Sequence, residues 1–126
     1  MSRDGVFSAA GRASVRERLA AERAETGAQI AALSRDFDQI VEANALVAVD
    51  DEHDPEGSST AFERAHIAAL LAQAHGRLVD LDRASERLER GDYGRCEGCG
   101  ERIPAERLEV RPAAGMCVRC AAARPD

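Results

Sequence analysis

The strongest constraint on this chain is the spacing of its four cysteines. Cys96 and Cys99 form one C-x-x-C pair, Cys117 and Cys120 form a second, and roughly seventeen residues separate the pairs. Two pairs at this spacing are typical of a zinc site, because each turns two thiolates toward one point and four sulfurs complete a tetrahedron. We therefore predict one structural Zn²⁺ ion, with no open coordination position for catalysis.

Glycines near the first pair support this prediction. Gly98 and Gly100 bracket Cys99, where a metal-binding turn is tight and often needs the positive φ that glycine adopts without steric penalty. A module of about 30 to 35 residues buries too little apolar surface to fold alone. We expect its folding to be coupled to metal binding.

The alternative uses of the cysteines are disulfides and thiol redox chemistry. Disulfides belong to oxidising compartments, and the first residues, MSRDGVFSAAGR, lack the apolar segment of a secretory signal. A thioredoxin-like C-x-x-C follows a strand-rich α/β pattern, which is missing ahead of Cys96. We expect a cytoplasmic zinc protein, with a thiol redox enzyme or zinc-dependent sensor as the weaker alternative.

Composition favours helices over a large core. The 126 residues are 44% hydrophobic but only 3% aromatic, and the many alanines favour helix while contributing little burial. No stretch approaches eighteen apolar residues, so we expect no membrane span. The net charge of −6 argues against a chain that coats nucleic acid.

Heptad spacing predicts two long helices. Between residues 12 and 49, one mainly apolar series repeats every seven residues and a second is interleaved with it, in the order Leu19, Thr26, Ile30, Leu33, Phe37, Ile40, Asn44 and Val47. Between residues 61 and 90 the same pattern returns in Ile67, Leu71, Ala74, Leu78, Leu81 and Leu88. Such seams let one helix lie along another.

The segment between the two seams predicts a turn. Pro55 and Gly57 interrupt the first helix, Thr60 and Glu63 match a capping box for the second, and Gly91 is placed to end it. The fold class is therefore mainly α: an antiparallel two-helix coiled-coil hairpin with a small C-terminal four-cysteine zinc-finger module. We expect a flexible N-terminus at 1–11, the hairpin at 12–90 with a tip loop at about 49–60, and the module at 91–126.

The expected tip is acidic. Asp50, Asp51, Glu52, Asp54 and Glu56 lie within seven positions, and such carboxylates repel one another. One interpretation is a solvated loop that keeps the hairpin soluble. The other is an acidic probe, held on a stiff rod, that reaches a basic or metal-containing cleft of a partner.

The module closely resembles the DksA/TraR group of bacterial transcription factors. The shared run is G-x-Y-G-x-C-x-x-C-G-x-x-I-x-x-x-R-L-x-x-x-P-x-x-x-x-C-x-x-C-A, matched here by Gly91, Tyr93, Gly94, Cys96, Cys99, Gly100, Ile103, Arg107, Leu108, Pro112, Cys117, Cys120 and Ala121. Over the hairpin the resemblance is one of architecture and spacing.

The resemblance implies a non-enzymatic regulator that binds RNA polymerase directly. It implies that the hairpin enters the secondary channel of the polymerase, with tip aspartates near the active centre, and that binding to DNA is not needed. The family's tip pattern D-x-x-D-x-A is similar to the stretch from Asp51 to Glu56, with Asp51 and Asp54 as the two aspartates and Glu56 in place of the alanine.

A response to the alarmone ppGpp depends, in some members, on basic groups. Arg111 resembles one of these, whereas Asp80 and Ala121 stand where basic residues are expected. The resemblance therefore predicts weak or absent ppGpp dependence. An intramolecular hairpin uses up its own seam, so we expect a monomer. The alternative function is a zinc-ribbon adaptor or nucleic-acid-binding module that does not use the polymerase channel.

Overall fold

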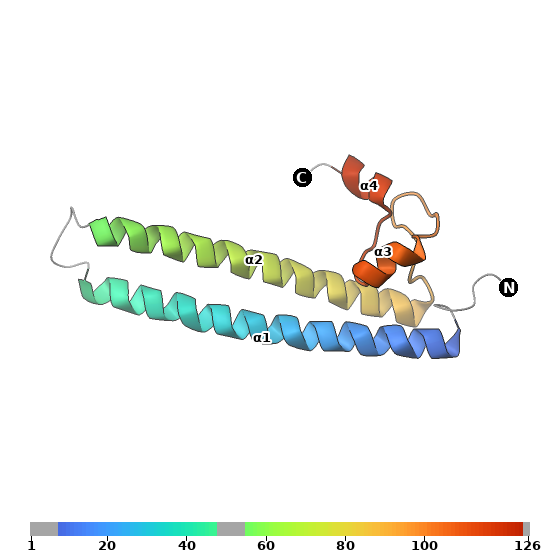
Figure 1. The fold of residues 1–126 in the computed structure, drawn as a ribbon, viewed down its shortest axis with the longest axis horizontal. Helices are drawn as coiled ribbons and strands as arrows, with labels where there is room; N and C mark the ends of the chain where they lie inside the picture. Colours follow the sequence, from blue (N-terminus) through green and yellow to red (C-terminus); the bar gives the residue numbers. More distant parts are fainter. Residues whose placement is uncertain (1–7, 48–54, 125–126) are drawn as a thin grey trace. The chain divides into compact units, whose positions relative to one another are not determined.

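The computed structural model describes residues 8–47 and 55–124 (Figure 1). They contain the helices α1 (Ala9–Val47), α2 (Pro55–Arg90), α3 (Ala105–Val110) and α4 (Val118–Ala123), and no strand. Within these ranges, no helix is both long enough and apolar enough to cross a membrane. The chain divides into two compact units: a cysteine unit, Met1–Ala24 with Leu78–Asp126, and a helical unit, Glu25–Arg77.

In the cysteine unit, α1 and α2 run antiparallel and are joined by two ion pairs. Arg16 Nε lies 2.8 Å from Glu89 Oε2, and Arg23 Nε lies 2.6 Å from Asp82 Oδ1. The partners are seven residues apart on both helices, as expected for a heptad seam. Hydrogen bonds from the arginines hold the pKa values of both carboxyls below their ordinary range. These pairs mark the register of the hairpin in this unit.

The core of the cysteine unit combines both long helices with the cysteine segment. Leu19 of α1 and Leu81 of α2 are each only 1% exposed. They belong to one buried cluster whose other members are Ala84, Leu88, Tyr93, Cys96, Ile103 and Leu108. Ala84 lies outside the predicted seam, but it is buried in the same cluster as Tyr93 and Cys96 of the cysteine segment. The segment therefore shares a hydrophobic core with the hairpin.

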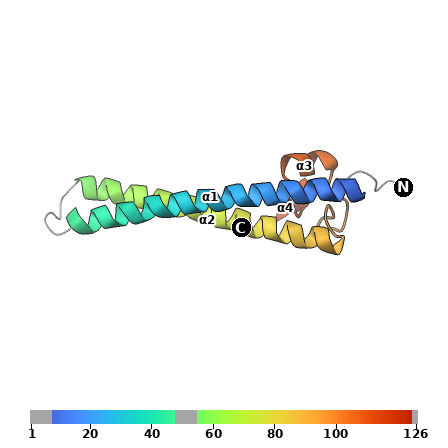
Figure 2. The ribbon, with the colours of Figure 1, turned by 90° about the horizontal axis from the view of Figure 1, so that it is seen from below.

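In the helical unit, the remaining parts of α1 and α2 lie side by side, as Figures 1 and 2 agree. Thr26 is 2% exposed and Ala74 is 4% exposed. The other predicted seam positions whose side chains are described here are half-buried: Ile30, Leu33, Phe37, Ile40, Asn44, Ile67 and Leu71. The heptad pattern thus identified the face along which the two helices pack.

Both long helices begin earlier than expected. Ser8 caps α1: its Oγ accepts a hydrogen bond of 3.0 Å from the Gly11 backbone N–H, and its carbonyl accepts one of 2.8 Å from Arg12. Helix α2 begins at Pro55, so the capping box predicted at Thr60 and Glu63 lies inside the helix and that prediction is wrong. Proline is well suited to a first helical turn, where its missing N–H and fixed φ cost nothing.

The C-terminal end of α2 lies at the predicted glycine. Gly91 has a φ of +90°; its N–H donates to the Leu88 carbonyl at 3.2 Å, and the Asp92 N–H donates to the Arg87 carbonyl at 2.8 Å. This pair of bonds is a Schellman motif, which needs a residue in the left-handed region. The chain leaves α2 here in a defined direction, toward the first cysteine pair.

Candidate metal centre

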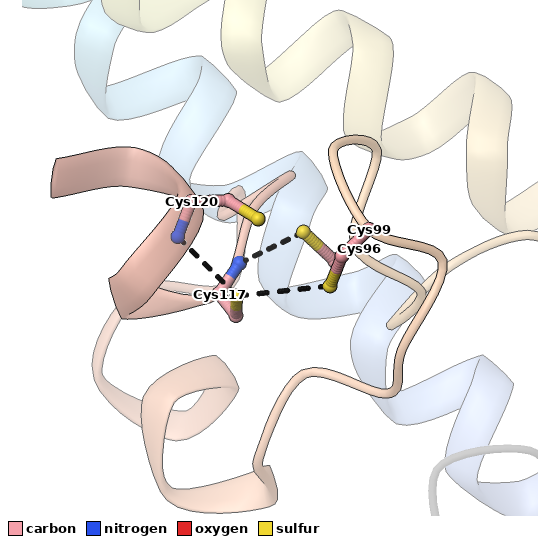
Figure 3. Close-up of side chains that lie close together, drawn as sticks. All are labelled: Cys96, Cys99, Cys117 and Cys120. Carbon is pink, nitrogen blue, oxygen red and sulfur yellow. Dashed lines mark hydrogen bonds between the residues drawn. The ribbon is translucent and has the colours of Figure 1, made fainter. Parts of the chain in front are cut away.

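The structure brings the four cysteines together (Figure 3). The sulfur atoms of Cys96, Cys99, Cys117 and Cys120 all lie within 4.8 Å of one another, and the Cys99 and Cys117 sulfurs are 4.0 Å apart. Zinc–sulfur bonds of about 2.3 Å in a tetrahedron place the sulfurs about 3.8 Å apart. Small adjustments of the side chains therefore suffice to bind one ion.

The first cysteine pair lies on a tight loop after α2. The Cys96 N–H donates to the Glu101 carbonyl at 2.7 Å, and the Gly100 N–H donates to the Cys96 carbonyl at 2.9 Å. Gly100 has a φ of +78°, as the sequence predicted for this turn. Gly98 does not have a positive φ; instead, a Cβ atom added there would lie 3.0 Å from the Cys120 sulfur. Gly98 is therefore needed for space beside the metal site.

The second pair lies at the start of α4. Cys117 is the N-cap of this helix, and its sulfur accepts a hydrogen bond from the Cys120 N–H at 3.5 Å. The Cys96 sulfur accepts bonds of 3.3 Å from the backbone N–H groups of Cys117 and Gly98. Backbone donors of this kind stabilise thiolates. The two pairs thus support each other through the main chain.

Hydrogen bonds give the thiols of Cys96 and Cys120 different pKa values. The N–H of Cys117, with further backbone donors, lowers the pKa of Cys96 to about 6. Hydrogen bonds to the neighbouring sulfurs of Cys117 and Cys96 raise the pKa of Cys120 to about 12. Hydrogen bonding thus favours the thiolate form of Cys96 and the protonated form of Cys120. Because zinc ligands are thiolates, metal binding releases protons.

The donor set fits zinc and a structural role. Four thiolates are soft ligands, unlike the oxygen ligands that Mg²⁺ and Ca²⁺ prefer. Four protein ligands fill a tetrahedral site and leave no position for water or substrate. Tyr93 and Ile103, only 3% and 2% exposed, belong to the buried cluster that also contains Cys96. The centre is one structural zinc site that joins the loop, α4 and the base of the hairpin.

Arginine side chains contact the chain next to both cysteine pairs; Arg107 belongs to the shared family run, whereas Arg83 and Arg87 were not singled out by the sequence analysis. Arg107 of α3 donates a 2.8 Å bond to the carbonyl of Met116, the residue before Cys117. Arg87 of α2 donates to the carbonyl of Arg95, the residue before Cys96. The sequence did contain a signal for Arg83 and Arg87. They are one turn apart on α2, and Glu97 is the one acidic residue between Cys96 and Cys99 with which they could pair.

The other predicted site residues lie apart from this centre. Asp51 and Asp54 fall in the segment 48–54, outside the described residues. Asp80 on α2, Arg111 after α3 and Ala121 on α4 are all exposed.

Comparison with known proteins identifies the module. Residues 91–125 match the prokaryotic dksA/traR C4-type zinc finger. The RNA polymerase-binding transcription factor DksA of Escherichia coli K12 is 40% identical over 40 residues, which are 32% of this chain and 26% of that protein. An uncharacterized protein of Aquifex aeolicus is 48% identical over 44 residues, 35% of this chain and 30% of that protein. The matched region thus spans less than a third of each of these curated relatives.

A solved structure extends the similarity to the hairpin. Transcription factor DksA2 from Pseudomonas aeruginosa aligns with a TM-score of 0.74 and 28% identity, over 92% of this chain and 84% of that one. The alignment therefore includes residues of the long helices as well as the four-cysteine module. A dksA/traR C4-type zinc finger thus forms the C-terminal module of this chain, and the similarity to the fold of DksA2 extends over most of its length.

Proposed function

We propose that this protein binds bacterial RNA polymerase and regulates transcription without catalysing a reaction. The observation that carries the proposal is the match to transcription factor DksA2 over 92% of the chain, because it includes hairpin and finger together. The name of the E. coli relative, RNA polymerase-binding transcription factor, supplies the partner. A metal site without an open position supports a binding role over an enzymatic one.

The hairpin supplies the means of reaching the polymerase. Helices α1 and α2 contain 39 and 36 residues, and the segment 48–54 that links them carries Asp51 and Asp54. We propose that the hairpin enters the secondary channel and that these two carboxylates act near the active centre. Glu56, in place of the family's alanine, lies in the first turn of α2. We expect this change to alter the effect on transcription more than the binding.

The partners follow from the same proposal. We expect the protein to act as a monomer and without sequence-specific binding to DNA. Asp80 and Ala121, in place of the basic residues of ppGpp-responsive members, predict weak or absent dependence on ppGpp.

The decisive experiment compares two matched double variants with the wild type. Asp51→Asn with Asp54→Asn removes two charges at the tip, and Asp36→Asn with Asp38→Asn removes two exposed charges from α1. Each zinc-loaded protein is tested for binding to RNA polymerase of its own organism and for its effect on transcription. We expect all three to bind, and only the tip variant to lose its effect.

Two outcomes contradict the proposal at different points. If the wild type does not associate with polymerase at micromolar concentration, the partner is wrong. If the tip variant remains as active as the α1 variant, the partner stands but the two aspartates are not the effectors. Salt-dependent retention of the wild type on DNA indicates instead a nucleic-acid-binding module.

A further inference from the structure

Arg87 is a largely enclosed guanidinium that holds the chain on both sides of a metal ligand. Its side chain is only 12% exposed. It donates to the carbonyl of Arg95 and, at 3.2 Å, to Glu97 Oε2. These two residues flank Cys96 in the sequence. A single side chain of α2 therefore binds the backbone carbonyl immediately before this cysteine and the side-chain carboxylate immediately after it.

The same arginine also holds the chain as it leaves the helix. Its guanidinium donates a 2.9 Å bond to the Asp92 carbonyl, and its own carbonyl accepts a 2.8 Å bond from the Asp92 N–H. Because the guanidinium is planar and has several donors in a fixed arrangement, it can bind all these acceptors together. The connection from α2 to the first cysteine pair is thus held at Asp92, Arg95 and Glu97.

Glu97 extends this network to the second cysteine pair. Its carboxylate also accepts a 3.0 Å bond from Arg83, one turn earlier on α2. Its backbone N–H donates at 2.8 Å to the carbonyl of Gly115, two residues before Cys117. Glu97 is therefore bound to the helix through its side chain and to the second cysteine segment through its main chain.

We propose that Arg87 is a positioning residue for the zinc site. It holds Cys96 in place for the metal through Arg95 and Glu97, and it connects metal binding to the last turn of α2. Because coupling is reciprocal, the zinc site and the last turn of α2 change each other's free energy by the same amount. Arg87 therefore strengthens zinc binding, and bound zinc stabilises the C-terminal turn of the hairpin.

Zinc affinity tests the first half of the proposal. Arg87→Ala and Arg87→Lys are compared with Arg90→Ala, a control at the same helix end whose arginine forms an exposed ion pair with the Asp92 carboxylate. Competition with a zinc chelator measures the dissociation constant. We expect Arg87→Ala to weaken binding by about 10- to 100-fold, as outer residues of metal sites do. Lysine, with one compact ammonium, should give an intermediate loss, and Arg90→Ala should resemble the wild type.

Cobalt(II) and the variant Glu97→Gln separate positioning from general damage. The four thiolate ligands are unchanged, so cobalt-loaded Arg87→Ala should keep the wild-type tetrahedral spectrum while binding more weakly. If Arg87→Ala fails to fold with excess zinc, the proposal is tested with Arg87→Lys and Glu97→Gln instead. Both variants should bind zinc more weakly than the wild type. The proposal is overturned if the folded Arg87 variants bind zinc as tightly as Arg90→Ala.

Hydrogen exchange tests the reciprocal half. In the wild type, zinc should slow the exchange of the Gly91 and Asp92 amides, which bond to the last turn of α2. In Arg87→Ala that slowing should be largely lost, even at zinc concentrations that saturate the site. Equal slowing in both proteins contradicts the coupling through Arg87.

Discussion

The hydroxyl of Tyr93 donates a 2.7 Å hydrogen bond to the carbonyl oxygen of Pro112. Tyr93 is 3% exposed and precedes the first cysteine pair, whereas Pro112, also buried, precedes the second. This bond ties together the two stretches that lead into the metal site. It gives the single tyrosine of the chain a structural role beside its hydrophobic packing.

Tyr93→Phe should therefore destabilise the folded protein. The variant keeps the ring but leaves the carbonyl of Pro112 without its donor, which costs about 1–2 kcal/mol. Urea unfolding of the zinc-loaded proteins measures this difference in the free energy of unfolding. A variant as stable as the wild type shows that water replaces the hydroxyl without loss.

High pH should weaken the fold through the same residue. Burial raises the pKa of Tyr93 to about 12, from about 10 in the unfolded chain. Between these values the unfolded state binds fewer protons than the folded state, so the free energy of unfolding falls as the pH rises. The difference between the folded and unfolded pKa values of Tyr93 corresponds to a loss of at most about 2–3 kcal/mol in the free energy of unfolding.

Phenolate absorbance can follow this titration, because the chain has one tyrosine and no tryptophan. We expect a midpoint near 12 in the folded protein and near 10 in urea. Tyr93→Phe serves as the control and should lose less stability over this pH range. Equal midpoints in the folded and unfolded proteins contradict the effect of burial.

Two glycine-to-alanine variants should differ in effect: one should weaken zinc binding and the other should stabilise α2. At Gly98 the new Cβ meets the Cys120 sulfur at 3.0 Å and its Cβ at 3.1 Å, so Gly98→Ala should weaken zinc binding. At Gly76, inside α2, nothing lies within 4 Å, and alanine should stabilise the helix by about 1 kcal/mol. Chelator competition and thermal unfolding measure the two effects. If Gly98→Ala binds zinc like Gly76→Ala, the spacing at Gly98 has no importance for the metal.

Truncating two leucines on α2 should show that the shared core of the cysteine unit contributes more to the free energy of unfolding than the helix seam does. Leu81 is 1% exposed in the core of the cysteine unit, whereas Leu71 is half-buried in the helical unit. Leu81→Ala should cost about 2–5 kcal/mol, and Leu71→Ala should cost less because less apolar surface is lost. Urea unfolding compares them. Equal losses mean that the cysteine segment adds little to the core around Leu81.

The predictable features were those encoded in local spacing. The two C-x-x-C pairs identified the sulfurs that the structure brings within 4.8 Å, because each pair already turns two thiolates toward one point. The heptads identified buried positions such as Leu19 and Leu81, because a repeat of seven keeps one face turned to its partner helix. Gly91 marked the end of α2, since a Schellman motif needs positive φ.

Boundaries and supporting contacts depended on the tertiary structure. Thr60 matched a capping box, yet α2 begins at Pro55, since proline is tolerated in a first turn. Ala84, outside the predicted seam, is buried in a cluster that also contains residues of the cysteine segment. Arg87 with Glu97, and Tyr93 with Pro112, are ten and nineteen residues apart. Sequence spacing determined the elements and the metal ligands, whereas these longer contacts were decided by how the chain returns on itself, which no local pattern encodes.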